Sequence, residues 1–282
     1  MAQRKIYNKQ DYTVDLENKV VVLSDNYYEK LSNFSNKWTS FKKIGGSSIG
    51  DVLEVDSFKS SFSAYCHIAR LKMPILQTKY IDAGVALEPK IFEFFKNLVH
   101  KKNPELEVNH YDAAEYNYDY FSGIDVIGGV PDGAINNLKM ILEIKTANAK
   151  KRSEWDKEIP KAYLKQAQLY AHLMGYTRIK FLTLFLNDSD YLNPENAEIS
   201  NSTFKVYDAS ALNKSEIVED IDFVKNWYNQ YTNTKVSPQF KPLIDKDQID
   251  YLLCENREQW KELFNRWKAQ KKVDENIDFE SV

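Results

Sequence analysis

The order of helical and strand patterns along the 282-residue chain predicts a mixed α/β (α+β) fold. Helical patterns come first, a β-rich centre follows, and a helix, two strands and further helices complete the order. The composition supports a packed core, because 43% of the residues are hydrophobic and 13% are aromatic, which excludes a disordered or fibrous protein. The length fits one large domain or two modest ones, and no repeat or Gly-, Ser- or Pro-rich linker marks a boundary.

Helical periodicity predicts three helices in the first hundred residues, over 26–34, 58–72 and 80–101. The third is the longest, and its apolar stripe consists of Ile91, Phe92, Phe95 and Leu98. Pro89 suits the first turn of a helix, because proline lacks an N–H group. It therefore predicts that the regular part of this helix begins there.

A β-rich centre follows, with strands predicted over 124–135 and 140–146. Beyond it, the pattern predicts a helix over 160–174, and Gly175 fits a left-handed cap that ends this helix. Four further elements are predicted in order, as strands at 178–186 and 202–208 and helices at 214–232 and 247–270.

The last predicted helix, 247–270, carries an apolar stripe of leucine, phenylalanine and tryptophan side chains. Such a stripe either docks on the protein's own core or offers a site to a partner, and we expect docking. The sequence therefore predicts a core over 1–245 and a C-terminal helical extension over 246–282.

Composition and charge exclude several classes of protein. The 38 basic and 41 acidic residues give a net charge of −3, which excludes nucleic-acid or membrane binding by bulk charge but leaves a local basic groove open. Only Cys66, Cys254 and four His occur, so a disulfide framework, a zinc finger and a Cys-bound iron–sulfur cluster are excluded. The polar start lacks a signal-peptide stretch, and runs such as 20–23 and 181–186 are too short to span a bilayer. We therefore expect a soluble, intracellular protein located in the cytoplasm.

The two predicted central strands carry acidic and basic side chains. Asp132 lies in the first strand, and Glu143 and Lys145 lie in the second. A two-residue turn at 136–137 would set Asp132 diagonally to Glu143, whereas a four-residue loop at 136–139 would set them directly opposite. Because side chains alternate between faces with a period of two, either connection places all three side chains on one face.

This juxtaposition has two interpretations. Carboxylates on neighbouring strands lie roughly 5–8 Å apart at Cβ, a span that a hard divalent cation bridges. Two acids beside a run as apolar as Met140-Ile141-Leu142 are costly unless a cation compensates their charge. In the alternative, Lys145 alone compensates, and the segment is a surface or half-buried Glu–Lys pair without chemistry.

Other polar residues favour the cation site. Glu88 stands three, four and seven positions before residues of the apolar stripe, so it lies on the core-facing side of its helix. Gln166 and Tyr170 are four apart and share a helix face. From Lys139 to Lys165, eight Lys or Arg accompany four Asp or Glu, a local charge of +4, although such a run is usually a solvated face. A cation-binding cluster beside a cationic strip is what a phosphodiester substrate requires.

Several motifs, in order and at compatible spacings over residues 40–185, carry a resemblance to a known family. They are Gly45-Gly46-Ser47-Ser48-Ile49-Gly50, Gly84-Val85-Ala86-Leu87-Glu88-Pro89, Pro131-Asp132, Glu143-Ile144-Lys145-Thr146-Ala147-Asn148, Trp155, Ile159-Pro160, and Tyr163-Leu164 with Gln166, Gln168 and Tyr170. Pro131-Asp132 with Glu143-Ile144-Lys145 resembles the PD-(D/E)xK nuclease signature. The whole set resembles the YqaJ-like viral recombinases, relatives of the phage lambda exonuclease.

The resemblance implies a restriction-endonuclease-like core, in which helices flank a central mixed β-sheet, as a nuclease domain over 1–245. It implies a metal-dependent DNA exonuclease that hydrolyses linear double-stranded DNA from 5′ to 3′ by a two-metal-type mechanism. The setting would be phage-type recombination or DNA end processing. The implied cofactor is Mg²⁺ or Mn²⁺. The implied partners are double-stranded DNA ends, further copies of the chain in a ring trimer, and a single-strand-annealing recombinase.

The same resemblance gives roles to individual residues. Asp132, Glu143 and the backbone carbonyl of Ile144 would hold one Mg²⁺ or Mn²⁺, and Glu88 would help to hold a second. Lys145 would orient or deprotonate the attacking water and offset charge on the scissile phosphate.

Further residues would support the metal site or contact DNA. Gln166 and Tyr170 match the motif that supports the lysine and the metal site. Ser47 and Ser48 match the loop that contacts the DNA end. The candidate cationic contacts are Lys42 or Lys43, for a 5′-phosphate, and Lys150 in the cationic strip.

The sequence departs from the family pattern in two respects. The second serine, Ser48, stands where many relatives have an acidic residue, and the segment between Glu88 and Asp132 is longer and rich in Tyr and Asp. Both departures concern recognition of the DNA end rather than hydrolysis. Asp125, seven positions before Asp132, is a weaker rival ligand.

Two alternative functions are compatible with the same observations. In the first, the chain is an endonuclease of restriction or repair type on the same fold. In the second, it is a DNA-binding protein whose acidic cluster is structural. Phosphate-loop, serine-hydrolase and HExxH zinc-protease motifs are absent from the sequence. No ATP dependence is therefore indicated.

Overall fold

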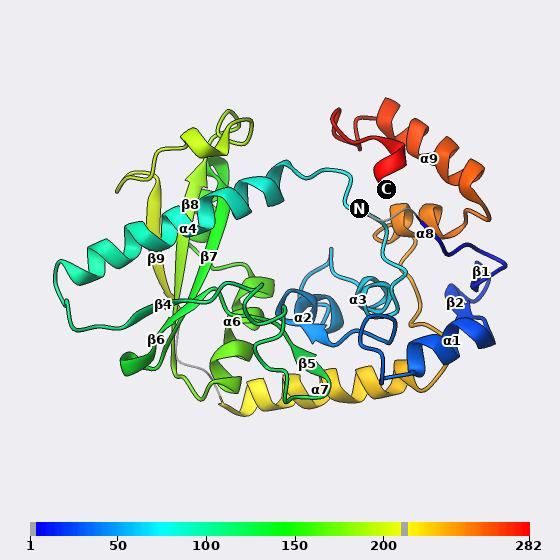
Figure 1. Cartoon of the computed structure of the whole chain (residues 1–282), viewed down its shortest axis with the longest axis horizontal. Helices are drawn as coiled ribbons and strands as arrows, with labels where there is room; N and C mark the ends of the chain where they lie inside the picture. The colour runs from blue at the N-terminus through cyan, green and yellow to red at the C-terminus, as the bar shows by residue number, and fades with distance from the viewer. Residues whose placement is uncertain (1–3, 210–213) are drawn as a thin grey trace. The chain divides into compact units, whose positions relative to one another are not determined.

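The computed structural model describes residues 4–209 and 214–282, and the chain divides into two compact units (Figure 1). Unit 1 and unit 2 are assembled from separate stretches of chain. They consist of Met1–Ile44, Ser48–Gln77 and Asp222–Val282 for unit 1, and of Gly45–Ser47 and Thr78–Ile221 for unit 2. The predicted mixed α/β fold is confirmed, while the predicted boundary at residue 245 stays a prediction. None of the described helices combines the length and hydropathy needed to cross a bilayer.

Unit 2 contains a five-stranded mixed sheet with the strand order β4-β6-β7-β8-β9. The strands are β4 (Val108–His110), β6 (Gly133–Ile135), β7 (Met140–Asn148), β8 (Arg178–Leu186) and β9 (Phe204–Ala209). β7 and β8 are parallel, and all other neighbours in this sheet are antiparallel. β8 has the predicted bounds, because its nearly unbroken apolar run suits a strand buried on both faces.

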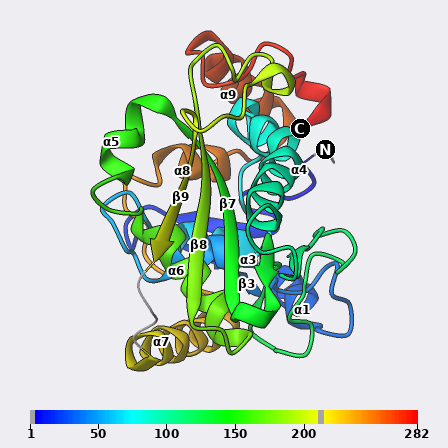
Figure 2. The same ribbon diagram turned by 90° about the vertical axis from the view of Figure 1, so that its left-hand side faces the viewer.

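Helices cover both faces of this sheet. On one face, α4 (Lys79–His100) packs in a core cluster that includes Leu87, Ile91, Leu142 and Leu184. On the other face, α6 (Lys161–Leu173) packs in a cluster that includes Ala167, Tyr170, Ile141 and Phe181. Figure 2 shows α4 and α6 to either side of β7 and β8. Because successive side chains of β7 alternate between the faces, Glu143 and Lys145 lie on the face of Ile141.

The β6–β7 connection is the four-residue loop of the two predicted alternatives. Ile135 pairs with Met140, and Gly133 pairs with Leu142. A short turn, η1 (Asn136–Leu138), followed by Lys139 at a left-handed φ of 48°, closes the loop. Continued by one residue, this register sets Asp132 opposite Glu143.

The long helix α4 corrects one prediction. It runs unbroken from Lys79 to His100, so Pro89 lies inside it and the predicted start at Pro89 is wrong. A proline at this position removes the helical hydrogen bond to the carbonyl of residue 85. Val85 is 69% exposed, so this turn of the helix is open to water, which lowers the cost of the missing bond. The left-handed cap after α6 is confirmed, since Gly175 has a φ of 67°.

The predicted strand over 124–135 is interrupted. Its ends form β5 (Ile127–Gly128) and β6, while Gly129 has a φ of 121° and Pro131 has no N–H group to donate to a ladder. The remaining short elements of unit 2 are α5 (Arg152–Trp155), η2 (Ala149–Lys151) and η3 (Pro194–Asn196).

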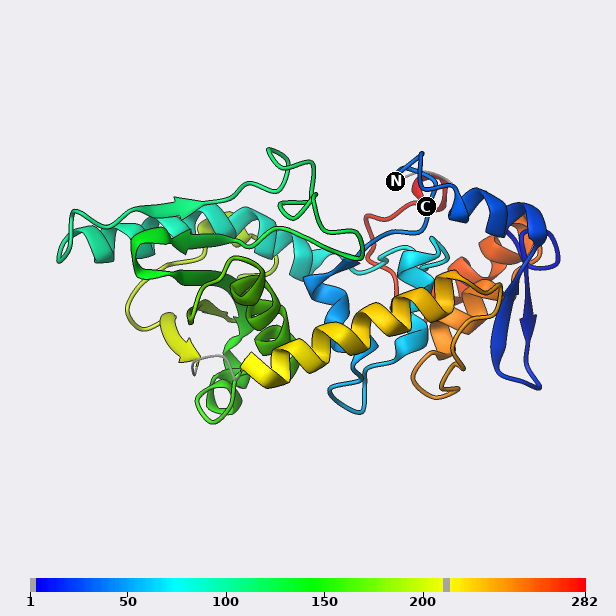
Figure 3. The same cartoon turned by 90° about the horizontal axis from the view of Figure 1, so that it is seen from below.

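Unit 1 combines a β-hairpin with helices from both ends of the chain. The hairpin consists of β1 (Tyr12–Asp15) and β2 (Val20–Leu23), drawn in dark blue in Figure 3. The helical elements within this unit are α1 (Asp25–Ser32), α3 (Ser61–Ile68), α8 (Lys246–Leu252), α9 (Arg257–Ala269) and η4 (Phe279–Ser281). Three elements belong partly to each unit: β3 (Ile44–Gly45), α2 (Gly46–Val52) and α7 (Lys214–Thr232).

Two helix predictions in unit 1 are wrong in extent. The helix expected over 58–72 is limited to α3. The helix expected over 247–270 is divided into α8 and α9, because the Asn256 side chain accepts a hydrogen bond from the Gln259 N–H and caps a new helix. An apolar stripe continues through such a break, so periodicity alone does not reveal it.

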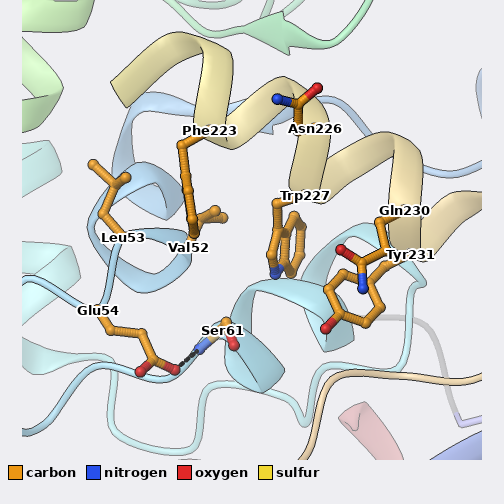
Figure 4. A pocket seen from close by; sticks show the side chains of 9 residues that line it. All are labelled: Val52, Leu53, Glu54, Ser61, Phe223, Asn226, Trp227, Gln230 and Tyr231. Carbon is orange, nitrogen blue, oxygen red and sulfur yellow. Dashed lines mark hydrogen bonds between the residues drawn. The ribbon is translucent and has the colours of Figure 1, made fainter. Parts of the chain in front are cut away.

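Unit 1 also contains a pocket of about 420 Å³ beside α7 (Figure 4). Trp227, Gln230 and Tyr231 of α7 line one side, and Glu54 and Ser61 line another. The Glu54 carboxylate accepts a hydrogen bond from the Ser61 N–H. Aromatic rings from α7 therefore form much of the wall of this pocket.

Gly129 provides a test of the packing of unit 2. Its backbone is left-handed, and a Cβ at this position would collide with the Tyr170 hydroxyl. We expect Gly129→Ala to destabilise the protein by about 1–3 kcal/mol, because strain and overpacking act together. The measurement is chemical denaturation. Gly123→Ala is the matched control, since a Cβ there would have no atom within 4 Å and the φ of Gly123 is ordinary. Equal stability of the two variants would contradict the described packing.

Candidate active site

Asp132 lies where β6 ends and the ladder with β7 opens. Its backbone carbonyl accepts a hydrogen bond from the Tyr111 N–H at 3.1 Å, which ties it to the chain beyond β4. Its side-chain Oδ2 accepts from the Ile144 N–H at 2.7 Å. The carboxylate thus takes the place that a backbone carbonyl would have if β6 continued. This bond fixes the direction of the side chain toward β7.

Glu143 and Lys145 form an ion pair on β7 that is largely shielded from solvent. The Glu143 side chain is fully buried, and Lys145 Nζ donates to its Oε2 at 2.8 Å. Lys145 Nζ also lies 3.6 Å from Asp132 Oδ2. The ammonium group therefore lies within ion-pair distance of both carboxylates, as the face-sharing argument requires. Removing one member of a buried charge group leaves the others uncompensated, which makes such groups sensitive to mutation.

The charges of these groups are strongly perturbed. Burial raises the pKa of Glu143, and the negative charges of Asp132 and Glu88 raise it further, while Lys145 opposes the rise. Burial alone would lower the pKa of Lys145, but the adjacent Glu143 and Asp132 carboxylates outweigh burial and raise it. Lys145 consequently stays protonated, and its positive charge belongs to the resting site.

Glu88 reaches the same site from α4. Burial raises its pKa, and the neighbouring Asp132 charge raises it further. Its Oε1 lies 3.1 Å from His110 Nε2 of β4, within hydrogen-bond distance. The core-facing position predicted for Glu88 therefore brings it close enough to interact electrostatically with Asp132 and Glu143.

Gln166 and Tyr170 approach from α6. Tyr170 is 3% exposed, and its hydroxyl accepts a hydrogen bond from the Gly46 N–H. Burial raises the pKa of Tyr170, and the charges of Glu143 and Asp132 raise it further. A Cβ at Gly46 would meet both the Tyr170 hydroxyl and Gln166 Cγ, so the two side chains pack against the glycine-rich segment.

The donor set fits a hard divalent cation. The described residues hold no group of three or more His, Cys, Asp or Glu side chains arranged around a metal position, so the carboxylates of Asp132 and Glu143 would need backbone oxygen or water to complete a site. Hard cations accept such sets. Glu143 Oε1 is buried and has no hydrogen-bond partner among the described residues, which leaves one carboxylate oxygen unsatisfied. The Ile144 carbonyl points to the same side of β7 as its N–H group, toward Asp132, beyond the last β6–β7 pair.

The predicted DNA-contacting residues divide between the two units. Ser47 is exposed and belongs to unit 2, whereas Lys42, Lys43 and the buried Ser48 belong to unit 1. Burial lowers the pKa of Lys42, and the nearby Arg70 charge lowers it further. The part of these lysines in DNA binding stays a prediction.

The predicted cationic strip over Lys139–Lys165 is partly neutralised by distant acids. Lys150 pairs with Asp188 at 2.6 Å, and Lys165 pairs with Glu216 and Asp220, each at 2.6 Å. These acids lie outside the counted segment, so the local charge of +4 overstates the positive charge that the folded chain presents. Asp125, the rival ligand, is exposed in the turn before β5.

Two polar residues of the site are not among those predicted from the sequence. His110 contacts Glu88, and Thr183 of β8 pairs in register with Lys145. Thr183 is fully buried, and its Oγ1 has no hydrogen-bond partner among the described residues. Thr183 could have been found from the sequence, because its hydroxyl interrupts the apolar run of β8. His110 could not, because the sequence pattern does not predict β4.

Comparisons with known proteins give the chain's relatives. Two uncharacterized mycoplasma proteins are similar to it: that of Mycoplasma genitalium is 28% identical over 267 residues, and that of Mycoplasma pneumoniae is 26% identical over 268 residues. Each match covers 80% of this chain and 91% of the relative.

The solved structures that the chain is similar to include two exonucleases. The alkaline exonuclease LHK-Exo from Laribacter hongkongensis is 16% identical, with a TM-score of 0.48, over 74% of this chain and 93% of that chain. A phage-related exonuclease from Haemophilus somnus 129PT is 14% identical, with a TM-score of 0.45, over 68% of this chain and 96% of that chain.

A family model described as the YqaJ-like viral recombinase domain matches residues 37–177, which is half of the chain. The matched range encloses Glu88, Asp132, Glu143 and Lys145, and it agrees with the motifs found over 40–185. The chain therefore belongs to the YqaJ-like viral recombinase domain family.

Proposed function

We propose that the protein is a metal-dependent DNA exonuclease that hydrolyses linear double-stranded DNA from the 5′ end. The observation that carries this proposal is the group of Asp132, Glu143 and Lys145 at the open end of the β6–β7 ladder, in a chain of this family; Glu143 is fully buried and the other two are partly buried. Two carboxylates and a lysine at the end of a β-hairpin have few structural reasons to be withdrawn from water together. They suit a reaction in which charge develops on phosphate oxygens.

In the proposed site, Asp132, Glu143 and the Ile144 carbonyl hold one Mg²⁺ or Mn²⁺, and Glu88 helps to hold a second. Oxygen ligands favour these ions over zinc. Bound there, such an ion lowers the pKa of a coordinated water and stabilises charge on the attacking and leaving oxygens. The unsatisfied Glu143 Oε1 supports this assignment, since a buried carboxylate oxygen without a donor has a place for a ligand.

Lys145 contributes positive charge in this proposal. Because its pKa is raised, it is protonated in the resting site, and a protonated ammonium group donates hydrogen bonds to water or phosphate. In this proposal Lys145 orients or deprotonates the attacking water and offsets charge on the scissile phosphate. Gln166 and Tyr170 hold the glycine-rich segment against this face and so keep the wall of the site in place.

The DNA end would be held by the segment around Gly45–Ser48. Ser47 is exposed, as a contact to DNA requires, whereas its neighbour Ser48 in α2 is 6% exposed. Lys150 is exposed, and its pair with Asp188 lies in solvent, where such pairs contribute little to stability. Exchanging Asp188 for a DNA phosphate would therefore cost little.

The first prediction about the reaction concerns the acidic group and the lysine. We expect Asp132→Ala, Glu143→Ala and Lys145→Ala each to reduce cleavage of end-labelled linear duplex by about 10²–10⁴-fold, because each removes a charge from the reacting centre. Since an alanine at position 143 leaves Lys145 buried without its partner, Glu143→Gln serves as a second variant that keeps the side-chain shape. Asp125→Ala is the control and should cleave normally. Loss of activity in Asp125→Ala with normal activity in Asp132→Ala would contradict the site.

The second prediction concerns the form of the DNA. With Mg²⁺, the wild-type protein should degrade linear duplex, leave closed circular duplex intact, and release label from a 5′ end before a 3′ end. A 5′-phosphate should accelerate the digestion of linear duplex. Nicking of the circle would instead indicate an endonuclease. The absence of both cleavage and metal binding would indicate a DNA-binding protein.

The third prediction concerns Glu88. Glu88→Gln should raise the Mg²⁺ or Mn²⁺ concentration needed for half-maximal cleavage, because an amide is a weaker ligand than a carboxylate. The measurement is a metal titration at saturating DNA. An unchanged metal dependence would remove Glu88 from the metal site, whatever the effect on the maximal rate.

A further inference from the structure

One side chain contacts a proposed metal ligand but has no role in the proposed reaction. His110, in β4, places Nε2 3.1 Å from Oε1 of Glu88, which lies 22 residues earlier in α4. The His110 side chain is 28% exposed and that of Glu88 is 37% exposed, so the contact lies at the margin of the core rather than free in solvent. A strand and a helix thus meet through a single polar contact beside the carboxylates.

The ring of His110 is held by packing as well as by this contact. Phe92 follows Glu88 by four residues, so both side chains lie on one face of α4. The Phe92 and His110 rings have centroids 4.8 Å apart and are tilted by 44°. One turn of α4 therefore supplies both the Glu88 carboxylate that His110 contacts and the Phe92 ring that packs against His110.

Gly133 provides the space for this arrangement. It pairs directly with His110 in the β4–β6 register and follows Asp132 in the chain. A Cβ at this position would lie 2.5 Å from the Asn109 carbonyl oxygen and 3.2 Å from Phe92 Cε2. Because glycine has no side chain, β4 and Phe92 approach closely enough to present His110 to Glu88. The same short segment of β6 thus places Asp132 and leaves room for the His110 ring.

Glu88 needs such a partner because of its surroundings. The negative charge of Asp132 repels the Glu88 carboxylate, whereas Lys145 attracts it. A glutamate on a helix has three rotatable bonds, so a Glu88 carboxylate without a fixed partner can take several rotamers. A hydrogen bond from a ring that is itself packed limits this choice of rotamer, as partners behind metal-binding carboxylates do.

We infer that His110 is a positioning residue that holds the Glu88 carboxylate in place for the second divalent cation. The inference rests on the proposed function, because it gives a purpose to the position of Glu88. His110 touches neither DNA nor the reacting atoms in this proposal. It acts through Glu88, and that dependence is what the experiment measures.

The experiment is a double-mutant cycle on the full chain. Wild type, His110→Ala, Glu88→Gln and the double variant are titrated with Mn²⁺ by calorimetry without DNA, and with Mn²⁺ in the cleavage assay. His110→Ala should weaken Mn²⁺ binding and raise the Mn²⁺ concentration for half-maximal cleavage by about tenfold, as loss of a partner behind a ligand does. In the Glu88→Gln background, His110→Ala should change the Mn²⁺ affinity and the Mn²⁺ concentration for half-maximal cleavage by less than about twofold. The carboxylate through which His110 acts is already absent from that variant.

Two further variants distinguish positioning from a general structural effect. His110→Gln retains an N–H donor and should recover most of the metal affinity, whereas His172→Ala, in the last turn of α6, should change neither binding nor cleavage. Thermal melting without metal shows whether each variant is folded. Equal effects of His110→Ala in both backgrounds, or wild-type metal affinity in His110→Ala, would overturn the inference. A wild-type protein that binds Mn²⁺ but cleaves no DNA would count against the proposed function alone, since the calorimetric cycle still tests the positioning role.

Discussion

The candidate site depends on one electrostatic constraint, the burial of Glu143 on a central strand. A fully buried carboxylate is stable when it is protonated or when an opposite charge compensates it, and in this structure Lys145 supplies that charge at 2.8 Å. Lys145 also lies within 3.6 Å of Asp132, so one ammonium group serves two acids. The other features of the site either bring further polar groups to Asp132, Glu143 and Lys145 or fix the backbone of the strands that carry these three residues.

The sheet topology explains why the cluster lies where it does. β6 is only three residues long, whereas β7 continues for six residues beyond its last pair with β6. The unpaired stretch of β7 offers the Ile144 N–H to the Asp132 side chain instead of to a neighbouring strand. Helices on both faces then deliver their polar residues to this stretch: Glu88 from α4, and Gln166 with Tyr170 from α6. A ladder that ran to the end of β7 would leave no opening for such a site.

Much of this site is predictable from local sequence rules. The period of two along a strand places Asp132, Glu143 and Lys145 on one face in either register, so the conclusion does not depend on the loop. Helical periodicity places Glu88 toward the core for a similar reason. The length of the loop itself is open from sequence, because Asn136-Asn137 suits a tight turn and only the pairing of Ile135 with Met140 decides the matter.

What the sequence does not reveal depends on contacts between distant segments. α4 continues through Pro89 because tertiary packing of its apolar face outweighs one lost hydrogen bond. Lys150 and Lys165 lose their apparent free charge to acids 38 to 55 residues away. The contact between His110 and Glu88 needs a strand of only three residues, too short for a periodic signal.

The charge cluster also connects folding with the proposed chemistry. Lys145 stabilises the two carboxylates in the folded chain, and the same lysine is the group proposed to orient water and offset phosphate charge. These roles are compatible only if the acids receive compensation from another source when substrate is present. A divalent cation would compensate the acids, and the site offers it oxygen ligands. These are the carboxylates of Asp132 and Glu143, including the unpartnered Glu143 Oε1, and the Ile144 carbonyl, which points toward Asp132. The electrostatics of the fold therefore support the proposed requirement for metal, since Lys145 is the positive charge beside Asp132 and Glu143 and is also the group proposed to serve the phosphate.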